Sequence, residues 1–135
     1  MLGILVTILF SINLISAEAC DPDVTLLNQD PYPAVPGDYV KLVFQVDNLE
    51  NPECNGFDFE LLADYPIEFD PGMDGVRTYG EFEFIKDYES NLLIPYEVRI
   101  NEDALDGENP IEVKFQNNVG VEIFETFSLE VEDSR

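Results

Sequence analysis

The clearest structural signal in this sequence is a run of alternating residues between Tyr39 and Asn48. A period of two is the repeat of a β-strand, so one parity is expected to enter a core while the other faces outward. Pro36-Gly37 before the run and Asn51-Pro52 after it are turn signals that set its limits. The run therefore predicts the central strand of an all-β domain. Its inward residues are Val40, Leu42, Phe44 and Val46.

The same alternation recurs along the chain, without a convincing helical period after the N-terminal segment. Seven or eight short strands separated by frequent turns are typical of an antiparallel immunoglobulin-like β-sandwich. We expect one such domain over residues 20–135, with Pro31, Pro33 and Pro36 forcing an extended crossing before the central strand. The other strands are expected at 24–27, 57–61, 66–70, 77–85, 92–100, 111–116 and through Phe127, Leu129 and Val131.

Two residues interrupt the expected strands. Pro95 lies within the run 92–100 on its outward parity and cannot donate a ladder hydrogen bond, which predicts an edge strand or a bulge there. Glu125 breaks the inward parity of the last strand, which predicts a bulge between Phe124 and Phe127.

The N-terminal segment is apolar from Met1 to Ala17 and is followed by Ala17-Glu18-Ala19, a small-x-small pattern read by signal peptidases. We therefore predict a secretory signal helix over residues 1–19 that is cleaved after Ala19. The alternative is a retained N-terminal membrane anchor, since the run is close to the minimum length of a membrane span.

The chain has two cysteines, Cys20 and Cys54, and in an exported protein two cysteines predict one disulfide. Two alternatives stay open at this point. Cleavage after Ala19 would place Cys20 at the mature N-terminus, where it could carry a lipid, or both thiols could be buried and unpaired.

The composition is strongly acidic, with 29 Asp and Glu against 6 Lys and Arg, for a formal charge of −23. Such a surface repels nucleic acids and anionic lipid headgroups, which excludes nucleic acid as a partner. A membrane contact is expected only through an uncleaved N-terminal segment or a lipidated Cys20. In an exported protein this acidity is typical of selection for solubility, of a salty habitat or of divalent cations nearby.

No catalytic site is predicted. Histidine is absent, which excludes histidine-based triads, and two cysteines are too few for a thiolate zinc site. No cofactor is expected, although calcium binding by an acidic loop is an alternative because calcium takes carboxylate and amide oxygens. The better candidate loop supplies Asn101, Asp103, Asp106 and Glu108, with Glu102 beside them, and the other contains Asp70 and Asp74.

The tyrosines divide into two groups. Tyr39, Tyr79 and Tyr96 fall within predicted strands and are expected to pack. Loops and strand ends carry the others, which are candidates for stacking on a sugar: Tyr32, Tyr65 and Tyr88.

Several segments resemble the immunoglobulin-like domains of archaeal S-layer-like cell-surface proteins. The matching segments are 28–31, Pro33, 36–40, 44–48, 60–66, 69–72, 96–100, 103–104 and 106–107. The resemblance spans nearly all of residues 23–132 and implies a sandwich displayed outside the cell, as in related adhesion modules. The sequence departs from the longer members by containing one such domain, without a second repeat or a C-terminal membrane helix.

The leading functional hypothesis is a non-catalytic module, extracellular or at the cell surface, that acts in adhesion or cell-envelope assembly. Its expected partners are other envelope proteins or surface glycans. A glycan- or calcium-binding module of a secreted system is the alternative, and a small carboxylate-dependent hydrolase is a distant third.

Overall fold

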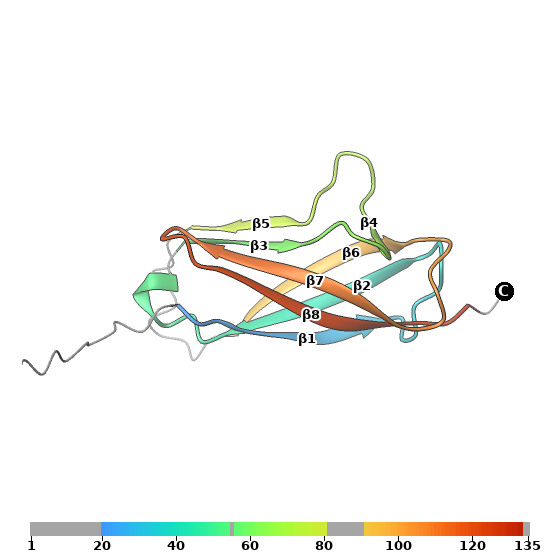
Figure 1. The fold of residues 1–135 in the computed structure, drawn as a ribbon, viewed down its shortest axis with the longest axis horizontal. Coiled ribbons are helices and arrows are strands. Elements are labelled where there is room, and N and C mark those ends of the chain that lie inside the picture. Colours follow the sequence, from blue (N-terminus) through green and yellow to red (C-terminus); the bar gives the residue numbers. More distant parts are fainter. Residues whose placement is uncertain (1–19, 55, 81–90, 134–135) are drawn as a thin grey trace, which may run out of the picture.

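Two four-stranded antiparallel sheets pack face to face in the computed structural model, which describes residues 20–54, 56–80 and 91–133 (Figure 1). The prediction of an all-β sandwich is confirmed. In the first sheet, the strand order is β1 (Asp23–Asp30), β2 (Tyr39–Asp47), β6 (Leu92–Ile100), β4 (Ile67–Glu68). In the second, it is β5 (Val76–Tyr79), β3 (Phe57–Leu61), β7 (Gly107–Asn117), β8 (Glu122–Val131). A 3-10 turn, η1 (Pro52–Cys54), precedes β3.

The core lies between the sheets and is centred on Phe44 of β2. Its ring contacts Phe59 of β3, Tyr96 of β6 and Phe127 of β8, with ring centroids 5.6 to 5.9 Å apart. The inward parity predicted for β2 is correct, since all four residues of the predicted inward set are buried. Aromatic rings in tilted contact fill the roughly 10 Å between two sheets, which explains why one strand anchors both layers.

The first and last strands differ from the prediction. The bulge lies in β1, where the pairing with β2 shifts between Leu26 and Asn28, and β1 is longer than the predicted 24–27. β8 pairs with β7 without a shift, so the predicted bulge between Phe124 and Phe127 is wrong. Because the register is continuous, Glu125 keeps the inward parity and Phe124 points outward.

Pro95 lies in an inner strand, but at a position that the short neighbouring strand β4 does not reach. β6 lies inside its sheet between β2 and β4, and its pairing with β2 runs without a shift, so the predicted bulge is wrong. Among the described residues, however, β4 pairs only with Arg99 and Ile100. Pro95 therefore lies at an edge of β6 that β4 leaves locally open. No residue of β4 reaches it, so the hydrogen bond that its backbone nitrogen cannot donate is not needed there.

Three further expectations have outcomes. β7 begins at Gly107, within the segment expected to be a loop, and its inward parity starts with the buried Asn109. The predicted strand 77–85 is seen as β5, and its continuation from residue 81 lies outside the described residues. The predicted signal helix over residues 1–19 also lies outside them.

Most loops lie at the two ends of the long axis, whereas the loop between β4 and β5 projects from the side (Figure 1). The start of β1, η1 and the turn between β7 and β8 lie at one end, and the C-terminal end of β8 lies at the other. Within the described part of the chain, no helix is long and apolar enough to cross a membrane.

Candidate functional site

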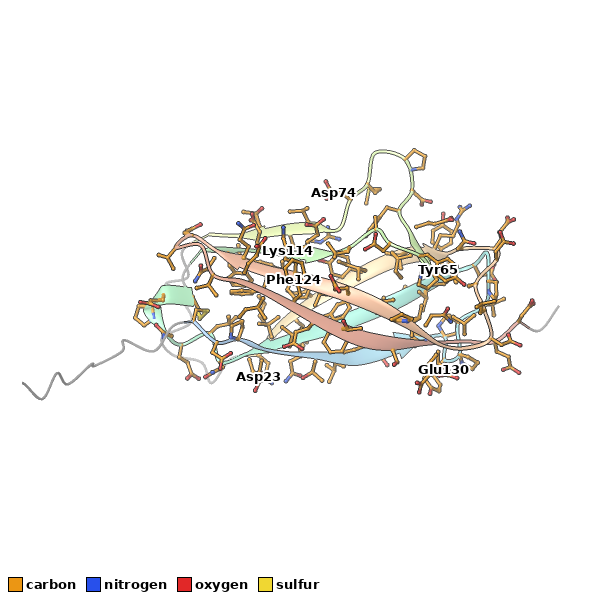
Figure 2. All side chains as sticks on the ribbon, viewed as in Figure 1. Asp23, Tyr65, Asp74, Lys114, Phe124 and Glu130 are labelled. Carbon is orange, nitrogen blue, oxygen red and sulfur yellow. A yellow bond between two sulfur atoms is a disulfide. The ribbon has the colours of Figure 1, made fainter. Side chains whose placement is uncertain are left out.

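The surface with the best-organised exposed side chains lies at the end of the sandwich that carries residues 62–66 and 101–106, and we call it the Tyr65 end (Figure 2). The Tyr65 hydroxyl accepts a hydrogen bond from the Leu105 amide at 2.9 Å and donates one to the Asp103 carbonyl at 3.3 Å. Both loops are thus joined by one side chain. The Tyr65 ring nevertheless stays 48% exposed, and neighbouring Leu105 is 70% exposed.

The loop between β6 and β7 is held against the core by Asn109, which lies outside the strand 111–116 expected from the sequence. Asn109 is buried in β7, and its side-chain amide donates to the Leu105 carbonyl at 2.8 Å and to the Gly107 carbonyl at 3.3 Å. Ala104 is buried as well. Because a buried amide must find partners, Asn109 ties the loop backbone to the core.

The predicted calcium ligands are only partly brought together. Both polar atoms of the Asn101 side chain are already engaged, since its Oδ1 accepts from the Asp103 amide and its Nδ2 donates to Glu68 Oε1 of β4, both at 2.7 Å. Asp106 Oδ1 accepts a hydrogen bond from the Asp133 amide. Glu108 lies on β7, opposite Glu130 of β8.

A shallow, open depression next to Tyr65 is lined by residues 102–106 and Asp133. It contains Asp103 and Asp106 but neither Asn101 nor Glu108. Within the described residues, no three acidic or cysteine side chains converge in a way that could hold a metal ion. The structure therefore gives no assembled calcium cage, and calcium binding stays a prediction.

A second exposed network, on the outer face of the first sheet, joins Tyr39, Asp70 and Arg99. Arg99 Nη2 donates to the Tyr39 hydroxyl at 2.7 Å, and that hydroxyl donates to the Asp70 carboxylate at 2.8 Å. The guanidinium carbon lies 4.9 Å from the centroid of the Tyr39 ring. The hydrogen bond to Tyr39 raises the pKa of Arg99 above its ordinary value.

This network holds the base of a projecting loop, residues 69–75 (Figure 1). Asp70 to Met73 form a turn closed by a hydrogen bond from the Met73 amide to the Asp70 carbonyl at 2.9 Å. Gly72, at φ 82°, takes the left-handed conformation that such a turn requires after Pro71. Met73 is 62% exposed beyond the sheet.

The far side of the same loop is held in the core by Tyr96. Its hydroxyl donates to the Gly75 carbonyl at 2.7 Å, and the Arg77 guanidinium carbon lies 4.6 Å from its ring centroid. Burial raises the pKa of Tyr96 far above its ordinary value, and this effect outweighs the opposing attraction of Arg77. A neutral, protonated phenol here has a structural role.

The tyrosine predictions have mixed outcomes. Tyr96 is buried and Tyr79 stacks on Phe57 at 5.1 Å, as expected, but Tyr39 is 41% exposed. Of the predicted sugar contacts, Tyr32 is 71% exposed and Tyr65 is held as described above. Tyr88 lies outside the described residues.

The predicted disulfide between Cys20 and Cys54 is confirmed. Both residues are buried, and their Cα atoms are 5.0 Å apart. The bond fastens the start of the domain to η1, at the end opposite Tyr65 (Figure 1). Lipidation of Cys20 and two unpaired thiols, the alternatives left open by the sequence, are both incompatible with this bond, because each sulfur is already used.

Sequence reasoning missed three of the groups that shape these surfaces. Arg99 is one of only 6 basic residues in the chain, which was a usable signal that it has an acidic or aromatic partner. Asn109 and the Gly75 carbonyl gave no comparable signal, because their roles depend on partners distant in sequence.

No protein-family model matches this chain, and no curated protein matches its sequence. Among solved structures, the chain is similar to the crystal structure of Spo0M, a sporulation control protein from Bacillus subtilis. The TM-score is 0.45 and the sequence identity 12%, over 85% of this chain and 50% of Spo0M. The chain thus spans about half the length of that protein.

Proposed function

We propose that this protein is an exported, non-catalytic module of immunoglobulin-like fold that contacts other molecules of the cell surface, in adhesion or envelope assembly. The Tyr65 end is the contact surface in this proposal. Its partners would be other envelope proteins or surface glycans.

The strand order supports the immunoglobulin-like part of the proposal. β1, β2, β6 and β4 correspond to the ABED sheet of that fold, and β3, β7 and β8 correspond to its CFG sheet. One departure is that the short β4 precedes β5 in the chain, while β5 extends the CFG side. The resemblance to archaeal S-layer-like domains belongs to the same proposal.

Export is supported by the disulfide and by the apolar N-terminal segment. Disulfides persist in oxidising compartments and are rare in reducing ones. The bond between Cys20 and Cys54 begins one residue after the proposed cleavage at Ala19. A leader over residues 1–19 that is removed after Ala19, or kept as an anchor, would bring the domain outside the cell.

The exposed but hydrogen-bonded Tyr65 is the observation that carries the contact role. Its hydroxyl is satisfied within the protein, so the ring is oriented and offers an apolar face to a partner. Little conformational entropy would be lost on binding, because the side chain is already held in place. Tyrosine is also among the residues most enriched at binding hot spots.

The same observation favours glycans as a second class of partner. Sugars stack on exposed aromatic rings, and the depression beside Tyr65 is rimmed by Asp103 and Asp106, whose carboxylates can accept hydrogen bonds from hydroxyl groups. Calcium binding by the same loop has less support, since Asn101 and Asp106 already accept hydrogen bonds from backbone amides.

The test is binding of the purified, labelled protein to envelopes isolated from the cells that produce it. Leu105→Ser and Tyr65→Ala should each weaken binding at least tenfold. Val119→Ser is the matched control, because Val119 is 69% exposed at the opposite end of the sandwich. Absence of binding by the unaltered protein, or equal losses in Val119→Ser and Leu105→Ser, would refute the proposal.

Calcium binding is tested separately by melting in NaCl and CaCl₂ at matched ionic strength. Exposed charges are screened over about 10 Å at 0.1 M salt, so both salts should raise the melting temperature equally if only screening acts. A calcium-specific rise that disappears in the Asp103→Asn, Asp106→Asn double variant would establish a site in this loop.

A further inference from the structure

β8 is an edge strand of the second sheet, and the structure shows which of its backbone groups face away from the sheet. One edge of β8 pairs with β7 along its whole length, from Glu122 to Val131. At Glu130, the opposite edge is occupied by other groups. The Glu130 amide donates to Gln29 Oε1 at 3.1 Å, and its carbonyl accepts from Gln29 Nε2 and from the Ala34 amide, both at 2.8 Å.

Backbone direction in an antiparallel strand repeats every second residue, so Glu130 sets the phase for β8. The Val121 carbonyl, of the opposite parity, accepts from the Asn117 amide of β7, as this phase requires. The amide and carbonyl groups that face the open edge are therefore those of Glu122, Phe124, Thr126 and Ser128. Within the described residues, no strand pairs with this part of the edge.

Apolar side chains beside this edge are incompletely covered. Ile123 and Phe127 of β8 and Val24 and Leu26 of β1 pack against the core but stay partly exposed. Phe124, on the outer face, is 52% exposed (Figure 2). A strand added along β8 would cover these side chains while it pairs with the free backbone groups, which is how strand addition gains affinity.

The charges along β8 select the kind of strand that could be added. β8 contains three glutamates and no Lys or Arg. Glu122 forms an ion pair with Lys114 of β7 at 3.5 Å. Glu125 lies on the inward parity and is partly buried. Among the described residues, Glu125 has no cation within ion-pair distance.

An inward-pointing charge on an edge strand opposes pairing with a like strand. A second copy would bring its own glutamates next to these, and like charges directly opposite each other destabilise a strand pair. A strand with Lys on the inward parity would instead gain an ion pair at Glu125. The methylene stems of its other Lys side chains would cover Ile123 and Phe127. Its apolar residues, on the other parity, would face Phe124. Attraction to one partner class and repulsion of another together give specificity.

We propose that the edge of β8 from Glu122 to Ser128 binds an extended segment of another protein in which basic and apolar residues alternate. Gln29 and Ala34 close the remaining end of the edge and so set the limit of the site. This edge is distinct from the Tyr65 end and takes a different class of partner, so strand binding and envelope binding are independent properties of the protein.

The test uses a nine-residue peptide of alternating Lys and Val and the purified chain. Binding is followed through the amide signals of the protein by NMR and through their hydrogen exchange. In the free protein, the amides of Phe124, Thr126 and Ser128 should exchange faster than those of Ile123, Glu125 and Phe127. The peptide should slow the exchange of the first group specifically.

Two matched controls separate strand pairing from simple attraction between a basic peptide and an acidic protein. The first is the same peptide with N-methyl groups on every second residue, which keeps the charge but blocks one backbone edge. It should bind at least tenfold more weakly. The second compares Thr126→Pro, which removes an outward amide without removing a bond to β7, with Thr126→Ala, which keeps that amide.

Thr126→Pro should weaken peptide binding at least tenfold, and Thr126→Ala less than twofold. If Thr126→Pro fails to fold, the N-methylated peptide still distinguishes strand pairing from simple charge attraction. Equal binding of the two peptides, protection of amides elsewhere than on β8, or no binding at millimolar peptide would overturn the proposal. So would sedimentation of the free chain as a dimer with these amides protected, because a second copy would then be the occupant.

Discussion

The Tyr96 hydroxyl offers a sharp test of the core, because removing it should have opposite effects at neutral and alkaline pH. Tyr96 is 3% exposed, and its hydroxyl donates to the Gly75 carbonyl at 2.7 Å. Tyr96→Phe keeps the ring and deletes only this donor. The Gly75 carbonyl still accepts from the Leu61 amide at 3.1 Å, so it is not left without a partner. The loss at pH 7 should therefore be that of one buried hydrogen bond, about 1 kcal/mol of unfolding free energy.

The alkaline effect follows from the pKa of Tyr96, which burial raises above the ordinary value of 10.0. Below pH 10 the phenol is protonated in both folded and unfolded chains, so its contribution is fully present. Above pH 10 the unfolded chain loses the proton while the folded chain keeps it, and stability falls by about 1.4 kcal/mol for each pH unit. This fall continues until the pH reaches the folded-state pKa. Phenylalanine has no proton to lose, so the variant avoids the loss.

The two curves should consequently cross near pH 11. Tyr96→Phe is expected to be about 1 kcal/mol less stable at pH 7 and about equal at pH 11, becoming more stable above it. Urea unfolding from pH 7 to 11.5 measures the difference directly, since other titrating groups act equally on both proteins. Tyr32→Phe is the matched control, because Tyr32 is 71% exposed and lies outside the core. A constant deficit for Tyr96→Phe across this range would refute the assignment of a buried, neutral phenol.

The remaining predictions concern packing, the disulfide and a close backbone approach. Phe44→Ala should lower the unfolding free energy by about 3–5 kcal/mol, whereas Gln45→Ala on the outward parity should cost little, and equal melting shifts would show that the register of β2 is wrong. Replacing Cys20 and Cys54 by serine opens a loop with a sequence separation of 34. The free energy of unfolding should fall by about 3–4 kcal/mol by the chain-entropy model. Urea unfolding with and without reductant measures this loss. Gly75→Ala would place a Cβ atom against the Leu61 carbonyl oxygen, too close for any real contact. Thermal melting should therefore show a strong destabilisation. An unchanged melting temperature would contradict the close approach of β3 to Gly75.

The candidate surfaces were less predictable from the sequence than the fold. The loop 101–108 was identified as acidic, but the hydrogen bonds of Asn101 and Asp106 depend on the positions of Glu68 and Asp133, which the pattern of residues does not reveal. Tyr39 was expected to pack because it begins an alternating run. It is exposed because its parity faces away from the second sheet, where Arg99 and Asp70 contact it instead.

Local patterns determined most of the strands and their faces, because alternation in a β-strand is a property of neighbouring residues. The inward set of β2 could be read from four apolar residues at spacing two, and the disulfide had only one pairing available. These features need no information about distant parts of the chain.

Tertiary structure alone decided which strands are edges and where pairing is interrupted. Glu125 in β8 and Pro95 in β6 both suggested bulges, yet both strands keep their register with β7 and β2. A half-buried glutamate is tolerated at the side of an edge strand, and a proline is tolerated where the neighbouring strand is too short to reach it. Both conditions depend on partners distant in sequence, so only the packing of the two sheets could reveal them.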